Sequence, residues 1–125
     1  MSYQHKNLAS GKWFELSFPV QMANIGSEVI RAINWKNKDN PQYCRQAFQR
    51  GLELLYLTIS DPKNKRRLRE LTRLYELLVD WFAFDNEYGS TEKAWQNYFL
   101  GFNYLAQKQR LTTETQRTQR RLEYF

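Results

Sequence analysis

The chain has 125 residues and a net charge of +6, with 42% hydrophobic and 16% aromatic residues. This length suits one small domain with a single hydrophobic core. The only cysteine, Cys44, excludes an internal disulfide framework. The sequence has neither a secretory signal nor the ~20 consecutive apolar residues that cross a bilayer, so we expect a cytoplasmic protein.

Turn signals divide the chain into four helical segments, preceded by an irregular segment over residues 1–16. In that segment, the Trp13-Phe14 pair is expected to fold back onto the core. The first helix is predicted to begin after a cap at Ser17 and to run to about Lys36. Its predicted inward stripe is Phe18, Met22, Ile25, Val29, Ala32 and Ile33.

An Asn- and Asp-rich turn at 37–41 ends this helix and caps a second helix over about 41–59. The inward residues of the second helix are predicted to be Cys44, Phe48, Gly51, Leu52, Leu55 and Ile59. A third helix is expected to open at Asp61-Pro62, a capping carboxylate followed by proline, and to reach about Phe84. Its predicted inward residues are Leu68, Leu71, Leu74, Tyr75, Leu78 and Phe82.

Ser90 or Thr91 is expected to cap a fourth helix that reaches about Lys108. Its predicted inward stripe is Trp95, Phe99, Phe102, Leu105 and Ala106. Four helices of similar length with short connections predict an all-α, up-down-up-down four-helix bundle over residues 17–108. Residues 109–125 form a polar basic tail, for which the sequence allows either a helical extension or a mobile arm.

Two of the predicted helices carry more apolar surface than one bundle core needs. Ile30 and Trp35 lie outside the first helix's stripe, and Leu100 and Tyr104 lie outside the fourth helix's stripe. In addition, Gly26 leaves room for a close backbone approach. These faces predict an interface with a partner or with a second subunit of a homo-oligomer, unless the two terminal segments cover them.

The residues needed for most enzyme chemistry are missing. His5 is the only histidine, which excludes histidine-based triads and zinc sites, and no histidine is placed to activate Cys44. The five glycines are scattered singly, so no phosphate-cradling loop is present. The carboxylates on the polar sides of the predicted helices are Glu28, Glu53, Glu76 and Asp80. We therefore expect no catalytic residues, no metal and no cofactor.

The most informative stretch is residues 61–73, which contain six cationic and two anionic side chains. The cations are Lys63, Lys65, Arg66, Arg67, Arg69 and Arg73. They crowd the start of the predicted third helix, where the helix dipole favours anions, so local helix stability does not explain them. At 100° per residue, one outward arc holds Lys65, Arg66, Arg69 and Arg73. This arc is either a solvated face with weak local ion pairs or a phosphate-binding surface.

A second basic group surrounds the loop between the first two predicted helices, at the opposite end of the bundle. Its members are Arg31, Lys36, Lys38, Arg45 and Arg50. The tail adds Lys108, Arg110, Arg117, Arg120 and Arg121. Because the chain has no recognisable base-reading motif, we expect contacts to the nucleic-acid backbone, of either RNA or DNA.

Residues 18–59 resemble the 23S rRNA intervening-sequence family of small bacterial four-helix bundles. The matching pattern is Asn24-Ile25-Gly26-Ser27-Glu28, then Phe48, Gly51-Leu52 and Leu54-Leu55. The accessory variability determinant (Avd) proteins of diversity-generating retroelements use the same fold and are similar in layout over residues 17–108. The charged opening helix and the proline before the Asn-Ile pair, which many family members have, are absent here.

This resemblance implies a ring-like homopentamer that binds RNA or DNA. In the retroelement branch it also implies a reverse transcriptase as partner. We therefore expect a non-enzymatic nucleic-acid-binding accessory protein that uses the cations of 61–73, with help from Arg45, Arg50 and the tail. The alternative is a protein-interaction scaffold, such as an antitoxin-like bundle, that binds a partner through its apolar helix faces.

Overall fold

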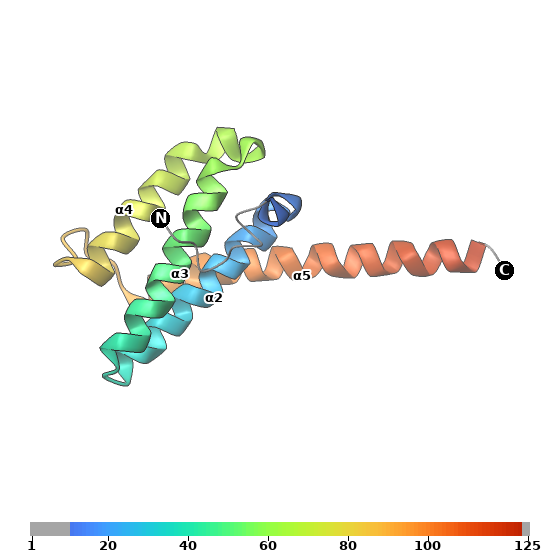
Figure 1. Ribbon diagram of the computed structural model, residues 1–125. Helices are drawn as coiled ribbons and strands as arrows, with labels where there is room; N and C mark the ends of the chain where they lie inside the picture. Colours follow the sequence, from blue (N-terminus) through green and yellow to red (C-terminus); the bar gives the residue numbers. More distant parts are fainter. Residues whose placement is uncertain (1–10, 124–125) are drawn as a thin grey trace.

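The computed structural model describes residues 11–123, which form helices joined by short turns and contain no strand (Figure 1). In chain order the elements are the 3-10 helix η1 (Lys12–Glu15), α2 (Phe18–Asn37), α3 (Pro41–Ser60), the 3-10 helix η2 (Pro62–Arg67), α4 (Leu68–Ala83) and α5 (Glu92–Glu123). The predicted all-α class with four long helices is confirmed. Within 11–123, no helix combines the length and apolarity needed to cross a membrane.

Short polar side chains begin the helices as the sequence predicts. The backbone N–H of Val20 donates to Ser17 Oγ at the start of α2, and that of Tyr43 donates to Asn40 Oδ1 at the start of α3. In both helices a proline occupies the first turn, where its missing N–H breaks no helical hydrogen bond.

Helix α2 is the centre of the fold, since it packs against both α3 and α5 (Figure 1). Where α5 crosses α2, a Cβ atom on Gly26 would lie 2.7 Å from Phe99 Cβ. The close approach that Gly26 predicts is therefore made within one chain. The buried hydrophobic core comprises Trp13, Met22, Ile25, Val29, Ile33, Leu54, Leu55, Leu57, Leu71, Leu74, Leu78, Trp81, Trp95 and Phe99.

Helix α5 has 32 residues, and its C-terminal part projects away from the other helices (Figure 1). The part of the tail up to Glu123 is thus a helical extension of α5. Every side chain from 107 to 121 is exposed. The hydroxyls of Thr112, Thr115 and Thr118 donate to backbone carbonyls four residues earlier in the same helix.

Three residues predicted to face inward are exposed instead: Leu68, Tyr75 and Leu105. The predicted third helix begins as the 3-10 helix η2 and becomes α-helical only at Leu68. Within α4 the buried apolar residues are Leu71, Leu74, Leu78 and Trp81, so the buried face is centred further round the helix than the sequence predicts. At 100° per residue Leu68 and Tyr75 lie at one edge of that face, which leaves them 39% and 38% exposed.

Two of the carboxylates that were placed on polar helix faces are buried, namely Glu28 and Asp80. Asp80 accepts hydrogen bonds from the backbone N–H groups of Glu87 at 2.9 Å and Tyr88 at 3.2 Å. Its carboxylate therefore fixes the loop between α4 and α5, where otherwise unpaired N–H groups would need another partner.

Candidate functional site

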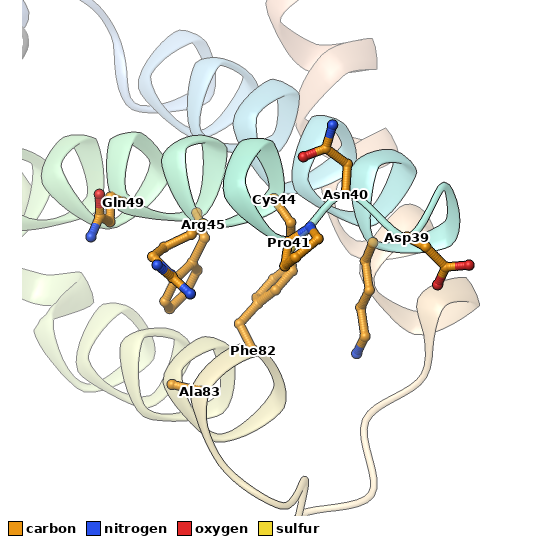
Figure 2. A pocket seen from close by; sticks show the side chains of 10 residues that line it. Asp39, Asn40, Pro41, Cys44, Arg45, Gln49, Phe82 and Ala83 are labelled. Carbon is orange, nitrogen blue, oxygen red and sulfur yellow. The ribbon is translucent and has the colours of Figure 1, made fainter.

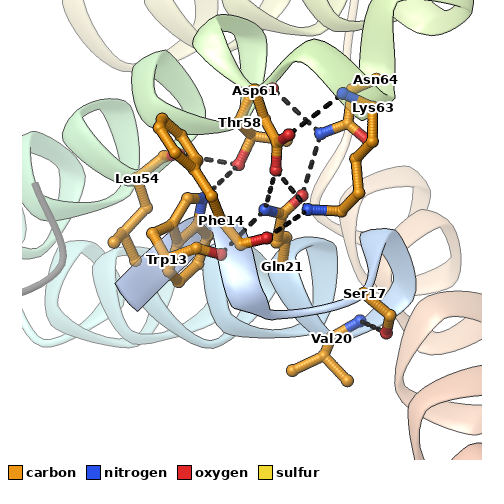
Figure 3. Close-up of polar contacts among 10 residues, drawn as sticks. All are labelled: Trp13, Phe14, Ser17, Val20, Gln21, Leu54, Thr58, Asp61, Lys63 and Asn64. Carbon is orange, nitrogen blue, oxygen red and sulfur yellow. Dashed lines mark hydrogen bonds and ion pairs between the residues drawn. The ribbon is translucent and has the colours of Figure 1, made fainter. Parts of the chain in front are cut away.

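A buried polar network ties η1, α2, α3 and η2 together at one end of the bundle (Figure 3). Gln21 is fully buried, and its Nε2 donates to Trp13 O at 3.0 Å and to Asp61 Oδ2 at 2.8 Å. Asn64 Nδ2 donates to Gln21 Oε1 at 2.9 Å and to Thr58 O at 3.0 Å. Because buried polar groups are costly unless paired, this network holds η2 in one position.

Asp61 plays two roles in this network. It caps η2 by accepting the N–H of Lys63 on Oδ1 at 3.1 Å, as the sequence predicts, and its Oδ2 forms an ion pair with Lys63 Nζ. Burial alone would raise the pKa of Asp61, but hydrogen bonds from Lys63 and Gln21 outweigh it and lower the pKa below the usual value. The carboxylate thus stays ionised at the start of η2.

Three further cations of 61–73 lie on η2 and the first turn of α4, next in sequence to this network, and we name Lys65, Arg66 and Arg69 the cation trio. All three side chains are exposed, and none has an acidic or hydrogen-bonding partner within residues 11–123. Glu70, four residues after Arg66 and thus at ion-pair spacing, forms no ion pair with Arg66 in the described part of the chain; its Oε2 lies 3.7 Å from Arg67 Nη1 instead. The trio is therefore free to bind an external anion.

The other three cations of 61–73 are engaged within the chain. Lys63 Nζ donates to Phe14 O at 3.0 Å and pairs with Asp61. The Arg67 guanidinium lies 4.2 Å from the centre of the Phe18 ring, and that of Arg73 lies 4.7 Å from the Tyr88 ring. These contacts hold cations that the sequence assigned to nucleic-acid binding.

Glu28 forms ion pairs with two arginines of the second basic group. Arg31 Nη1 lies 3.1 Å from Glu28 Oε1, and Arg50 Nε lies 3.1 Å from Glu28 Oε2. Removing either arginine would leave a buried carboxylate less well paired, so this cluster is part of the packing between α2 and α3. Helical periodicity does not reveal this cluster, because it places Glu28 on the polar side of the first predicted helix.

The rest of the second basic group lies at the α2–α3 turn, at the other end of α3 from η2 (Figure 1). Lys36 Nζ is 4.6 Å from the centre of the Trp81 ring, and Lys38 Nζ is 5.1 Å from that of Trp35. Such cation–π contacts hold a lysine in place without neutralising it. Arg45 is exposed and has no partner in the described part of the chain.

Beside this turn, a cleft of about 760 Å³ opens between the start of α3 and the end of α4 (Figure 2). Phe82 points from α4 toward Pro41 and Cys44 of α3, as Figure 2 shows. The Phe48 and Phe82 rings are stacked with centres 4.8 Å apart. We call this space the turn cleft; its lining is Lys36, Asp39, Asn40, Pro41, Cys44, Arg45, Phe48, Gln49, Phe82 and Ala83. No sequence pattern predicts this cleft, because it is formed between α3 and α4.

The four residues predicted to form an interface fall into two classes. Ile30 is half-buried and packs on the core, and half-buried Trp35 lies edge-on to Tyr43, with ring centres 4.8 Å apart. In contrast, Leu100 and Tyr104 are 63% and 65% exposed. Only the second pair offers an uncovered apolar surface.

The residues 11–123 contain no group of three or more His, Cys, Asp or Glu side chains that could hold a metal ion. Cys44 is half-buried at the turn cleft, and burial raises the pKa of its thiol. A raised pKa keeps a thiol protonated and weakly nucleophilic at neutral pH. The only histidine, His5, lies outside the described residues.

The sequence matches no known family model, and neither a curated protein nor a solved structure is significantly similar to it.

Proposed function

We propose that this protein is a non-enzymatic nucleic-acid-binding protein that contacts the phosphate backbone through the cation trio. The supporting observation is that Lys65, Arg66 and Arg69 are exposed and unpaired within the described chain, whereas neighbouring cations are engaged. Each phosphate that such a cation neutralises releases counterions and adds a salt-dependent increment of affinity. The basic free part of α5 adds further positive charge.

The rigid network next to the trio supports the same proposal. Asp61 and Asn64 are buried and hydrogen-bonded, so the backbone that carries the trio does not need to become ordered on binding. RNA and DNA share a charged phosphate backbone, and both are within the proposal.

The resemblance to intervening-sequence and Avd proteins adds a more specific role. By that resemblance, we propose that the protein assists a reverse transcriptase in a diversity-generating retroelement and assembles as a ring-like homopentamer. The observation that favours an assembly is the exposed apolar face of α5, which carries Leu100, Tyr104 and Leu111. Light scattering that gives the mass of a monomer at every concentration would contradict the assembly.

The backbone-binding proposal is tested by the double variant Arg66→Gln/Arg69→Gln. Its matched control is Lys12→Gln/Lys93→Gln, which removes the same charge from two exposed positions, on η1 and α5, that have no partner in the described part of the chain. The first variant should bind RNA and DNA more weakly, with a slope of log affinity against log salt that is shallower by about 1.4 to 1.8. The control should keep the wild-type slope to within about half of that change. Equal effects of the two variants would show dependence on net charge and not on the trio.

The same exposed face of α5 supports a second function, that of a protein-interaction scaffold. A contiguous apolar stripe on a helix is a usual docking surface for another helix. If this is the main function, Tyr104→Gln should abolish association with the partner or with a second subunit. In that case the wild-type protein should show no nucleic-acid binding at low salt.

A further inference from the structure

The turn cleft differs from the surface that carries the cation trio, because it is concave and combines aromatic rings with an unpaired cation, Arg45. Its volume of about 760 Å³ lies within the range of small-ligand sites. The wall formed by Phe48 and Phe82 is only partly buried, so each ring packs on the core and also borders the cleft. Lys36 and Arg45 line the same space together with one carboxylate, Asp39, so the cations of the lining outnumber its anions.

We propose that the turn cleft binds an unpaired base of a single-stranded nucleic acid, with the base against Phe48 and Phe82 and its phosphate at Arg45. This inference rests on the proposed function and adds a substrate class to it, since the cation trio alone does not distinguish single strands from duplexes. Stacking on aromatic side chains is the general way in which proteins hold single strands without reading their sequence.

The composition of the cleft fits a nucleotide better than an uncharged apolar ligand. A base is flat and apolar on its faces, which suits Phe48, Phe82 and Pro41, whereas its phosphate requires a cation. Arg45 supplies a planar guanidinium with no competing carboxylate partner in the described chain, and such a group pairs well with phosphate oxygens. The bases of a duplex are stacked on each other and are not available to the cleft.

Helix α3 offers a path from the turn cleft at its start to η2, which carries Lys65 and Arg66, at its end. Arg45, Gln49 and Tyr56 share one arc of α3 at helical spacing, and all three are exposed. Helix α3 has 20 residues and is therefore about 30 Å long, so its two ends are within reach of one short strand. Tyr56 offers a second exposed ring part-way along that path.

Cys44 allows a direct test, because it is the only cysteine of the chain and lines the cleft. The rate of its alkylation by iodoacetamide is measured on the wild-type protein alone, with saturating oligothymidine, and with a saturating duplex of equal length. A base in the cleft should slow alkylation severalfold with oligothymidine and leave it unchanged with the duplex. Equal protection by both, or protection by neither while both bind, would overturn the proposal and leave backbone binding intact.

Affinities of variants provide the second readout. Arg45→Gln and Phe82→Leu should each weaken oligothymidine binding by about tenfold and leave duplex binding within about twofold. The matched control, Arg66→Gln, should weaken both ligands alike. Equal losses for both ligands with Arg45→Gln would overturn the base site. If neither ligand binds the wild type at low salt, the proposed function itself fails.

Any other occupant would be visible in the same assay. An acidic amphipathic peptide that slows Cys44 alkylation when saturating oligothymidine does not would show that the cleft binds protein. That result would also overturn the proposal.

Discussion

Both ends of α3 carry exposed cations, but the surroundings of those cations differ. At the η2 end, the cation trio lies next in sequence to a closed network in which Gln21, Asp61 and Asn64 are hydrogen-bonded and buried. At the turn end, Arg45 borders an open cleft between α3 and α4. Net charge alone therefore does not define a binding surface, because the side chains next to the cations determine which groups of a ligand can bind there.

The partners of each cation separate the two ends further. At the η2 end, Lys63 and Arg67 are bound by a carboxylate, a carbonyl and a ring, which leaves a small and fixed set of free charges. At the turn end, Lys36 and Lys38 lie over tryptophan rings and keep their charge. We therefore expect the η2 end to matter most for stability and backbone contact, and the turn end for the kind of nucleic acid bound.

The largest expected effect is on the η2 end. Asp61→Ala removes the cap of η2 and takes from buried Gln21 and from the ammonium of Lys63 one of their two acceptors. We expect a loss of about 2–4 kcal/mol in the free energy of unfolding, measured by urea denaturation. The contrast is Arg45→Gln at the turn end, which should change that free energy by less than about 0.5 kcal/mol. Similar losses in the two variants would remove the distinction between the ends.

The next largest effect is expected where α5 crosses α2. Gly26→Ala places a Cβ 2.7 Å from Phe99 Cβ, where α5 crosses α2. The helices must shift apart, so we expect the free energy of unfolding to fall by about 1–3 kcal/mol. The preference for single strands over duplexes should stay the same, because neither end of α3 is touched.

Gly101 provides the matched control for this change. A Cβ on Gly101 has no heavy atom within 4 Å, and the residue lies inside α5. Gly101→Ala should therefore stabilise the protein by about 0.5–1 kcal/mol, since alanine favours a helix over glycine. A loss of stability there would mean that the outer face of α5 is covered by something else.

The smallest effect is a dependence of stability on pH from the η2 end. The pKa of Asp61 is lower in the folded protein than the ~3.9 of an unfolded chain, so its carboxylate stabilises the fold above that pH. This contribution is lost as the pH falls through the folded-state pKa. Urea midpoints measured from neutral to acid pH should therefore fall less steeply in Asp61→Asn than in the wild type. Parallel curves would show that Asp61 does not carry this dependence.

Much of the fold was predictable because it depends on local chemistry. The caps at Ser17, Asn40 and Asp61 each place a helix start, and the buried stripe of α2 follows its 3.6-residue period. The exposure of Leu68 and Tyr75 was not predictable, because the buried face of α4 is centred on Leu74, Leu78 and Trp81, and contacts with the other helices decide which part of an apolar face is buried.

The candidate site was predictable only in part. Sequence reasoning found the cations, since charge density along a chain is visible without a structure. It did not find which of them are engaged, because Arg50 meets Glu28 from another helix and Arg67 meets Phe18. The turn cleft depends on contacts between α3 and α4 that no local pattern encodes.

The central claim, that this protein binds nucleic-acid backbone, is tested most directly by the affinity of the wild type for oligothymidine across a range of salt concentrations. With the trio and Arg45 each neutralising one phosphate, log affinity should fall linearly with log salt, with a slope of roughly −3. A flat dependence on salt, or no binding at the lowest salt, would contradict the account.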